Sequence, residues 1–280
     1  MKVVETLRDR LETDGFAVIE GFAPAGAIAE VRARAAEIVA AFDPSVASGV
    51  FSAADEKERA DEYFLGSGST VRCFFEKEAF DASGALRQPK ALSINKIGHA
   101  LHDLDPVFER FSHGPALDAV ARGAGLAEPH VYQSMYIFKQ PHIGGEVRWH
   151  QDATYFWTEP QTVITLWFAL EAADRSNGCL WVQRGGQHGP LRERFVLDGG
   201  VGKTVKLDAA PWPSESQAEP LEVEAGALVV FAGRLPHYSA PNRSEVSRHA
   251  YTLHVVDGAA RYAPENWLQR GAGLPVRGLV

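Results

Sequence analysis

Residues 163–170 read Val-Ile-Thr-Leu-Trp-Phe-Ala-Leu, an almost unbroken apolar run with the length of one buried strand. Similar short apolar segments occupy 131–140, 180–183, 221–223, 227–231 and 250–256. Turn-forming pairs such as Asn177-Gly178 separate them, and 191–219 is expected to be a long irregular loop. Parallel strands would need crossover helices, and no helical pattern lies between these segments. The region therefore predicts an antiparallel β-sandwich or barrel.

The chain before this region is expected to be mostly helical. Apolar spacing predicts a first helix that ends at Asp14-Gly15, a short strand at 16–19 and a longer Ala-rich helix at 26–42. A further helical region is expected at 106–123. Residues 43–90 lack clear periodicity, so we expect loops and short helices there.

Composition argues against several classes of protein. The 280 residues are 45% hydrophobic and carry a net charge of −8, without a basic run. Such a chain is poorly suited to a nucleic-acid backbone or an anionic membrane surface, so we expect neither as a partner. The longest apolar runs are too short to span a bilayer, and the N-terminus has no apolar signal segment. With only Cys73 and Cys179 and no disulfide pattern, a cytoplasmic location is expected.

The sharpest candidate for chemistry is the tetrapeptide Trp149-His150-Gln151-Asp152. Residues two apart on a strand face the same side, so His150 and Asp152 can direct a nitrogen and an oxygen to one point. His237 follows the strand at 227–231 and supplies a second imidazole. Two His and one carboxylate on one face of a metal form the facial triad of non-haem iron(II) oxygenases. A His-x-Asp spacing also arises by chance, so it does not decide the function alone.

A second cluster competes with this one. His99, His102 and Asp105 recur every three residues, so on a helix they would share a face. We favour a polar stripe on an exposed helix over a metal site, because an Asp-Pro pair at this point is typical of a helix start. His249 and His254 have no carboxylate at a useful spacing, and we expect both to be structural or rim residues.

Arg248 begins the last strong strand, shortly after His237. If the strands at 227–231 and 248–256 are neighbours, Arg248 can enter the barrel that holds His237. A buried guanidinium needs an anionic partner, and a dicarboxylate that chelates the metal at one end would supply it at the other. Ser239 could share that anion. A surface salt bridge with Glu245 is the alternative.

Several longer motifs occur in order along the chain. They are Gln133-Ser134-Met135-Tyr136-Ile137-Phe138-Lys139-Gln140-Pro141, Gly144-Gly145-Glu146, His150-Gln151-Asp152-Ala153, Asn177-Gly178-Cys179-Leu180-Trp181 and the segment 224–248. Together they resemble the phytanoyl-CoA dioxygenase family, and most closely its branch of phytanoyl-CoA dioxygenase domain-containing proteins. The similarity extends from about Ser93 to Val256, with a weaker match at 14–18.

That resemblance implies a mainly β fold, a double-stranded β-helix core of the jelly-roll or cupin type with N-terminal helices. We expect a single domain over residues 1–280. Its mostly helical N-terminal part would cover about 1–127, and the jelly-roll core that carries the metal site would cover about 128–260.

The same resemblance implies the cofactors and their ligands. Iron(II) would be held by His150, Asp152 and His237. The cosubstrate 2-oxoglutarate would chelate the iron and reach Arg248 with its distal carboxylate. The branch's remaining cosubstrate positions are occupied here by Lys96, Met135, Trp167 and Ser239. The implied enzyme is a 2-oxoglutarate-dependent dioxygenase that uses O₂ to oxidise a C–H bond of a small-molecule substrate, with release of succinate and CO₂.

Two alternatives stay open: a non-oxidative metal-dependent cupin enzyme, and a catalytically silent cupin that binds a small ligand or a partner. Neither needs an anion clamp inside the barrel, so Arg248 and Ser239 separate them from the oxygenase. One departure concerns the substrate, because the family usually has Pro-Gly-Ser-His where this chain has Arg184-Gly185-Gly186-Gln187. That motif borders the substrate side in the family, so the departure indicates a different substrate. Tyr155, Phe156 and Trp157 are candidates for the substrate wall.

Overall fold

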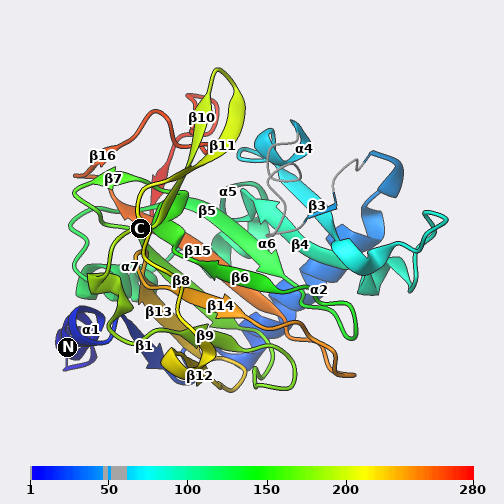
Figure 1. The fold of residues 1–280 in the computed structure, drawn as a ribbon, viewed down its shortest axis with the longest axis horizontal. Helices are drawn as coiled ribbons and strands as arrows, with labels where there is room; N and C mark the ends of the chain where they lie inside the picture. The colour runs from blue at the N-terminus through cyan, green and yellow to red at the C-terminus, as the bar shows by residue number, and fades with distance from the viewer. Residues whose placement is uncertain (1, 47–49, 52–61) are drawn as a thin grey trace.

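The computed structural model describes residues 2–46, 50–51 and 62–280, and its core is a pair of facing β-sheets (Figure 1). The larger sheet has the strand order β1-β13-β8-β15-β5-β4-β3-β2, with β17 paired to β5. Its strands are β1 (Phe16–Ile19), β13 (Leu228–Ala232), β8 (Ile164–Ala169), β15 (Ala250–Asp257), β5 (Pro129–Ile137), β4 (Ile94–His99), β3 (Val71–Glu76), β2 (Val50–Phe51) and β17 (Arg277–Gly278). Each pairing is antiparallel except that of β2 with β3.

The smaller sheet has the order β12-β9-β14-β6 and is antiparallel throughout. Its strands are β12 (Glu219–Leu221), β9 (Leu180–Val182), β14 (His237–Ser239) and β6 (Val147–His150). Together the two sheets form the jelly-roll core that the resemblance implies. The sandwich interior widens into a cavity, which is lined by residues of both sheets.

The alternation of side chains along β8 and β15 explains how one sheet serves both a core and a cavity. Leu166 and Leu253 pair across the two strands and lie in the main hydrophobic core. Their neighbours Thr165, Trp167 and Thr252 face the opposite side and line the cavity. Because successive side chains of a strand point to opposite faces, an apolar outer face and a mixed inner face coexist. The unbroken apolar run at 163–170 is therefore a central strand.

Helices cover the outer face of the larger sheet. The α-helices are α1 (Lys2–Thr13), α2 (Ala25–Ala41), α4 (Glu62–Leu65), α5 (Leu101–Leu104), α6 (Pro106–Ser112) and α7 (Pro115–Gly123). Short 3₁₀ turns are η1 (Pro44–Val46), η2 (Lys77–Ala79), η3 (Lys90–Leu92), η4 (Asp152–Thr154), η5 (Gly186–His188) and η6 (Glu215–Gln217). The buried side chains of α2 at Ile28, Val31 and Ala35 pack in the same core cluster as Leu166. The predicted helices at 26–42 and 106–123 are confirmed in type and place, apart from the break between α6 and α7.

Two expectations about irregular segments were wrong. The described residues within 43–90 contain strands β2 and β3, and β4 follows them. These three strands join the larger sheet together with β1, which was predicted at 16–19 and is confirmed. Within 191–219, strands β10 (Glu193–Asp198) and β11 (Val201–Lys206) form a hairpin around Gly199 and Gly200, both with positive φ. In Figure 1 this hairpin projects from the body of the molecule. Strands β7 (Thr158–Glu159) and β16 (Arg261–Tyr262) form a second small antiparallel sheet of two strands. The extent of the single domain stays a prediction.

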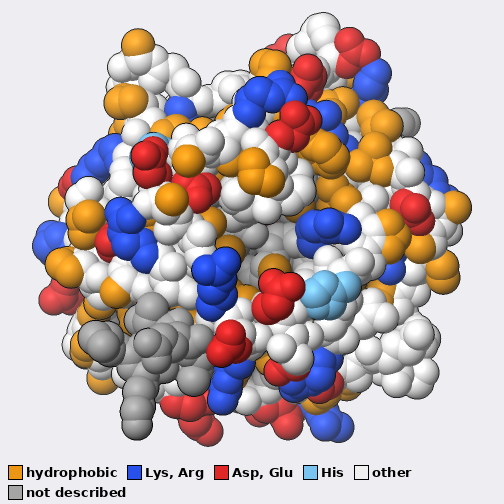
Figure 2. Space-filling view, turned by 90° about the vertical axis from the view of Figure 1, so that its left-hand side faces the viewer, with side chains coloured by type: hydrophobic (Ala, Val, Ile, Leu, Met, Phe, Trp, Pro, Cys, Tyr) orange, Lys and Arg blue, Asp and Glu red, His pale blue; other side chains and the backbone are white. Residues whose placement is uncertain are grey.

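Other general expectations can be compared with the structure. Cys73 and Cys179 are both buried and unbonded. Among the described residues, no helix combines the length and the apolar character needed to cross a membrane. Figure 2 shows one face of the molecule, where Lys and Arg side chains are interspersed with Asp and Glu. The cytoplasmic location and the absence of a nucleic-acid partner stay predictions.

Candidate metal and cosubstrate site

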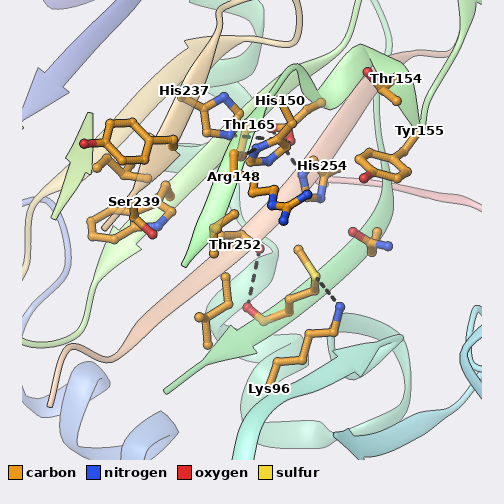
Figure 3. A pocket seen from close by; sticks show the side chains of 18 of the residues that line it. Lys96, Arg148, His150, Thr154, Tyr155, Thr165, His237, Ser239, Thr252 and His254 are labelled. Atoms are coloured by element: carbon orange, nitrogen blue, oxygen red, sulfur yellow. Dashed lines mark hydrogen bonds and ion pairs between the residues drawn. The ribbon is translucent and has the colours of Figure 1, made fainter. Parts of the chain in front are cut away.

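The cavity between the sheets brings together every residue that the sequence predicted to bind the metal or the cosubstrate. His150 ends β6, Asp152 begins η4, and His237 begins β14. β14 pairs with β6, which places His237 directly opposite His150. The other predicted members that line the same cavity are Lys96, Met135, Trp167, Ser239 and Arg248. Figure 3 shows His150 and His237 together at one side of the cavity, with Lys96 entering from the opposite side.

The three predicted metal ligands converge on one point. A set of ligand atoms, one from each of His150, Asp152 and His237, lies within 4.8 Å of one another. Asp152 Oδ1 is 3.5 Å from His150 Nε2 and 3.7 Å from His237 Nε2. The strand does not supply this geometry alone, because β6 ends at His150 and the chain turns into η4 at Asp152. The turn brings the carboxylate towards the two imidazoles.

Backbone carbonyls fix the tautomer of both imidazoles. His150 Nδ1 lies 2.8 Å from the carbonyl oxygen of Arg148, and His237 Nδ1 lies 3.0 Å from that of Leu235. A carbonyl only accepts hydrogen bonds, so Nδ1 is the donor in both rings and Nε2 is the nitrogen left to face a metal. Metal-binding histidines are commonly oriented in this way. Burial and the neighbouring His237 lower the pKa of His150 to about 4, so His150 is neutral at pH 7, the form that binds metals.

The second oxygen of Asp152 is held by two residues that were not predicted as members of the site. Thr165 donates a short hydrogen bond to Oδ2, and His254 Nε2 lies 3.4 Å from the same atom. Burial alone would raise the pKa of Asp152, but the imidazoles of His237 and His254 lower it. The carboxylate is therefore ionised, with Oδ2 occupied and Oδ1 directed to the histidines.

A positively charged end of the cavity begins at Arg248. Its side chain is 2% exposed and passes over the Trp167 ring, 5.5 Å from the ring centroid. Arg248 Nε donates to the carbonyl of Gly178 at 3.1 Å, but Nη1 has no hydrogen-bond partner among the described residues. Burial lowers the pKa of Arg248 to about 10, which still leaves it charged at pH 7. A buried guanidinium with an unused donor is suited to an anionic ligand.

The remaining predicted cosubstrate residues line the same cavity. Ser239 lies two residues after His237 on β14, is 1% exposed and lines the cavity. Lys96 Nζ lies 3.9 Å from the sulfur of Met135 and over the rings of Phe64 and Phe74, at 5.2 and 5.3 Å from their centroids. The alternative of a surface salt bridge between Arg248 and Glu245 is wrong. Glu245 Oε2 instead lies 3.1 Å from Nε2 of the exposed His142.

The structure supplies its own test of whether iron and 2-oxoglutarate fit. Two imidazoles and one ionised carboxylate are the donor set of non-haem iron(II). In the same cavity, Arg248 Nη1, which has no hydrogen-bond partner among the described residues, and the Ser239 side chain can receive a carboxylate. Both groups therefore fit the residues present.

Comparison with known proteins agrees with this geometry. The family model described as phytanoyl-CoA dioxygenase matches residues 11–250. This chain belongs to the phytanoyl-CoA dioxygenase family. A protein of Arabidopsis thaliana named phytanoyl-CoA dioxygenase is 44% identical over 94% of this chain and 92% of its own length. Phytanoyl-CoA dioxygenase domain-containing protein 1 of Bos taurus is 45% identical over 95% of this chain and 94% of its own.

Solved structures show the same fold at lower identity. The epimerase SnoN, crystallised with Fe³⁺, alpha ketoglutarate and nogalamycin RO, has a TM-score of 0.64 at 15% identity and covers 98% of both chains. EctD from S. alaskensis, crystallised with 2-oxoglutarate and 5-hydroxyectoine, has a TM-score of 0.61 at 18% identity, over 94% of this chain and 82% of that one. As a member of the phytanoyl-CoA dioxygenase family, the protein is an iron(II)- and 2-oxoglutarate-dependent dioxygenase.

The second His-rich cluster of this dioxygenase is not the exposed helical stripe that we expected. His99 and His102 are fully buried, and His99 is the last residue of β4 rather than part of a helix. His102 Nε2 is 3.0 Å from Asp103 in a buried network with Arg270. Asp105 accepts hydrogen bonds from the backbone at the start of α6, which confirms its expected role at a helix start.

The structure does not support the inference of a different substrate from the departure from the phytanoyl-CoA dioxygenase pattern at 184–187. None of these residues lines the described cavity. Arg184 makes ion pairs with Asp14 and Glu219, and Gln187 Nε2 donates to backbone carbonyls at the end of α1. The segment therefore ties the smaller sheet to the N-terminal helix. Of the predicted substrate wall, Tyr155 and Phe156 line the cavity and Trp157 is not among its lining residues.

His254 was not predicted as a site residue because no carboxylate lies at a useful spacing from it in the sequence. The signal was a period of two that begins just before β15: Arg248, Thr252 and His254 all line the cavity, whereas His249 lies on the other side against Tyr136. The expectation that the strands at 227–231 and 248–256 are neighbours was also wrong, because β8 lies between β13 and β15. Arg248, two residues before β15, enters the cavity without that contact.

Proposed function

We propose that this protein hydroxylates a C–H bond of a small-molecule substrate. One 2-oxoglutarate and one O₂ would be consumed for each substrate, and succinate, CO₂ and the hydroxylated product would be released. His150, Asp152 and His237 hold the iron(II). Arg248 and Ser239 bind the distal carboxylate of 2-oxoglutarate, and Lys96, Met135 and Trp167 line the cosubstrate's side of the cavity.

The observation that carries this proposal is the buried guanidinium of Arg248 in the cavity of the His-Asp-His cluster, because its Nη1 has no hydrogen-bond partner among the described residues. A non-oxidative cupin enzyme or a silent binding module does not need an anion clamp next to a metal site. An enzyme that binds a dicarboxylate between metal and arginine does need one.

The bound iron would supply the activation of O₂ and of the substrate C–H bond. The chain's own residues keep the ligands in place. Thr165 and His254 hold the second carboxylate oxygen of Asp152, and hydrogen bonds from Nδ1 to two backbone carbonyls orient His150 and His237 with Nε2 towards the metal position. Gln151, which lies between two ligands, donates to the carbonyls of Pro190 and Arg234 and so anchors the turn that carries Asp152.

The rest of the cavity supports a substrate whose reacting part is small and largely apolar. Phe64, Phe156 and Trp267 line it, and Tyr155 and Arg148 lie on the same side as His254 (Figure 3). Phe156 stacks on His254, with the ring centroids 4.7 Å apart. An aromatic wall next to the metal ligands can exclude water from the reacting carbon.

The test is the conversion of 2-oxoglutarate to succinate in air with added iron(II), across a library of metabolites. We expect iron-dependent succinate formation that a true substrate stimulates, with one hydroxylated product per succinate. The same assay with His237→Ala is the control for free iron in solution. If the parent protein forms no more succinate than the His237→Ala variant with every compound, the proposed function is wrong.

A further inference from the structure

Lys139 is a buried cation that the family resemblance and the proposed function leave without a role. It follows β5, is 2% exposed and has φ of 41°, an uncommon backbone conformation for a residue other than glycine. Met135, Ile137 and Lys139 alternate along the chain and all line the cavity. The side chain therefore points to the end of the cavity that holds Arg248 and Ser239.

The ammonium of Lys139 is fully used by oxygen acceptors. Nζ donates to the Ser239 hydroxyl oxygen at 2.8 Å, to the Gly145 carbonyl at 2.8 Å and to the Ser239 carbonyl at 3.3 Å. Because Lys139 donates to Ser239 Oγ, the Ser239 O–H proton must point elsewhere. The only hydrogen bond of Ser239 Oγ recorded among the described residues is the one from Lys139, which leaves its proton for a ligand in the cavity.

The backbone also joins Lys139 to the arginine of the anion site. The carbonyl of Lys139 accepts a hydrogen bond from the Arg248 N–H at 3.2 Å. Gly178, whose carbonyl accepts from Arg248 Nε, leaves room for the lysine side chain. A Cβ added at Gly178 would lie 2.5 Å from Lys139 Cε. Lys139, Ser239, Gly178 and Arg248 thus form one connected unit.

The charges around this unit favour an incoming anion. Lys139 and Arg248 are both buried, and the buried acid on the cavity wall beside them is Glu76, whose Oε2 accepts from the Gly145 N–H at 3.2 Å. Burial and the charge of Arg248 lower the pKa of Lys139, which Glu76 and Glu146 partly oppose. A carboxylate bound between the two cations would relieve their repulsion.

We propose that Lys139 is a positioning residue of the cosubstrate site, which turns the Ser239 hydroxyl towards the distal carboxylate of 2-oxoglutarate. This inference rests on the proposed function, because it takes 2-oxoglutarate as the ligand of Arg248 and Ser239. It extends the predicted contact set to a residue that acts through Ser239.

The experiment is anaerobic titration of the iron(II)-loaded protein with 2-oxoglutarate and with 2-oxopentanoate, which lacks the distal carboxylate. In Lys139→Met we expect 2-oxoglutarate to bind about ten- to a hundredfold more weakly, because a hydrogen bond to a charged group is lost. Binding of 2-oxopentanoate and of iron should stay the same. Lys139→Gln, which keeps an N–H donor, should recover part of the loss and provides a second variant if Lys139→Met does not fold. Lys203→Met removes an exposed lysine, paired with Asp198, as the matched control.

A double-mutant cycle with Ser239→Ala tests the mechanism. If Lys139 acts through Ser239, adding Lys139→Met to Ser239→Ala should cost little further affinity. Independent, additive losses would overturn the positioning role, as would unchanged 2-oxoglutarate affinity in both lysine variants. An equal fall for both oxoacids would show a general structural defect and also overturn it. If instead the parent protein does not prefer 2-oxoglutarate to 2-oxopentanoate, the proposed function itself fails.

Discussion

At the scale of single residues, His150 and His237 are oriented by the same kind of hydrogen bond in different surroundings. The His150 side chain is 23% exposed and that of His237 only 6%, yet each donates Nδ1–H to a carbonyl two residues before it in the chain. The turn that carries each ligand therefore also sets the orientation of its ring. The carboxylate of Asp152 needs partners from other strands, namely Thr165 on β8 and His254 on β15.

Removing either imidazole should abolish tight iron binding. In His150→Ala or His237→Ala, two ligands remain of three, which is too few to hold a labile divalent ion well. The fold should survive, because the hydrophobic core lies on the other face of the larger sheet. Iron(II) titration of each variant, with circular dichroism as the check on folding, measures this. His142→Ala is the matched control, since His142 is half-exposed and pairs with Glu245. Parent-like affinity in either ligand variant would contradict the assignment.

The residues that hold the second oxygen of Asp152 should contribute less to iron affinity than the ligands themselves, but by a measurable amount. His254→Ala or Thr165→Val frees the second carboxylate oxygen, and loss of such a supporting contact typically weakens metal binding by about ten- to a hundredfold. Thr252→Val is the control, because Thr252 lies on β15 next to the site and its hydroxyl is directed to the Met135 carbonyl instead. If iron affinity fell equally in His254→Ala, Thr165→Val and Thr252→Val, the contact with Asp152 would not be the cause of the weaker binding.

At the scale of elements, the turn before β9 (Leu180–Val182) connects the smaller sheet to the anion site. Gly178 has φ of 87°, and its carbonyl holds Arg248. In Gly178→Ala, the left-handed backbone and the close approach of Lys139 and the Ala240 carbonyl should lower the free energy of unfolding by about 1–3 kcal/mol. We also expect weaker 2-oxoglutarate binding with iron affinity retained.

Denaturant unfolding and anaerobic titration together measure the effect of Gly178→Ala. Gly199→Ala in the β10–β11 turn is the comparison, because Gly199 also has positive φ but has no neighbouring atoms near an added Cβ. It should lose stability without losing 2-oxoglutarate affinity. If both variants lost 2-oxoglutarate affinity, the loss in Gly178→Ala would not be due to the contact of Gly178 with the anion site.

Element by element, the sequence predicted the strands whose outer faces are apolar and missed those whose pattern is broken. β8 and β13 have almost entirely apolar sequences and were found at nearly their observed bounds. β4 was missed because Asn95, Lys96 and His99 interrupt its apolar pattern, and all three line the cavity. The β10–β11 hairpin was missed because most of its β11 side chains are exposed, so burial leaves no period in the sequence. His254 was missed because its partner Asp152 is close only in three dimensions.

At the scale of the whole molecule, the main hydrophobic core and the functional site lie on opposite faces of the larger sheet. The outer face of the larger sheet packs on helices α2, α6 and α7 and supplies the main core, while its inner face and the smaller sheet enclose the site. The metal ligands come from β6, η4 and β14, whereas Arg248 of the anion clamp lies just before β15 of the larger sheet, so the site depends on both sheets. The central claim is that the cavity holds a dicarboxylate between the metal and Arg248.

The most direct test of that claim is anaerobic titration of 2-oxoglutarate into the iron(II)-loaded protein, in the parent and in Arg248→Ala. Removing Arg248 leaves a desolvated carboxylate without its partner, at a cost of about 3–5 kcal/mol, or roughly a hundredfold or more in affinity. Arg248→Lys should recover only part, because an ammonium cannot form the planar two-point contact. Iron affinity should hardly change in either variant. We predict one iron-dependent 2-oxoglutarate site per chain that is lost in Arg248→Ala, and equal affinity in parent and variant would contradict the account.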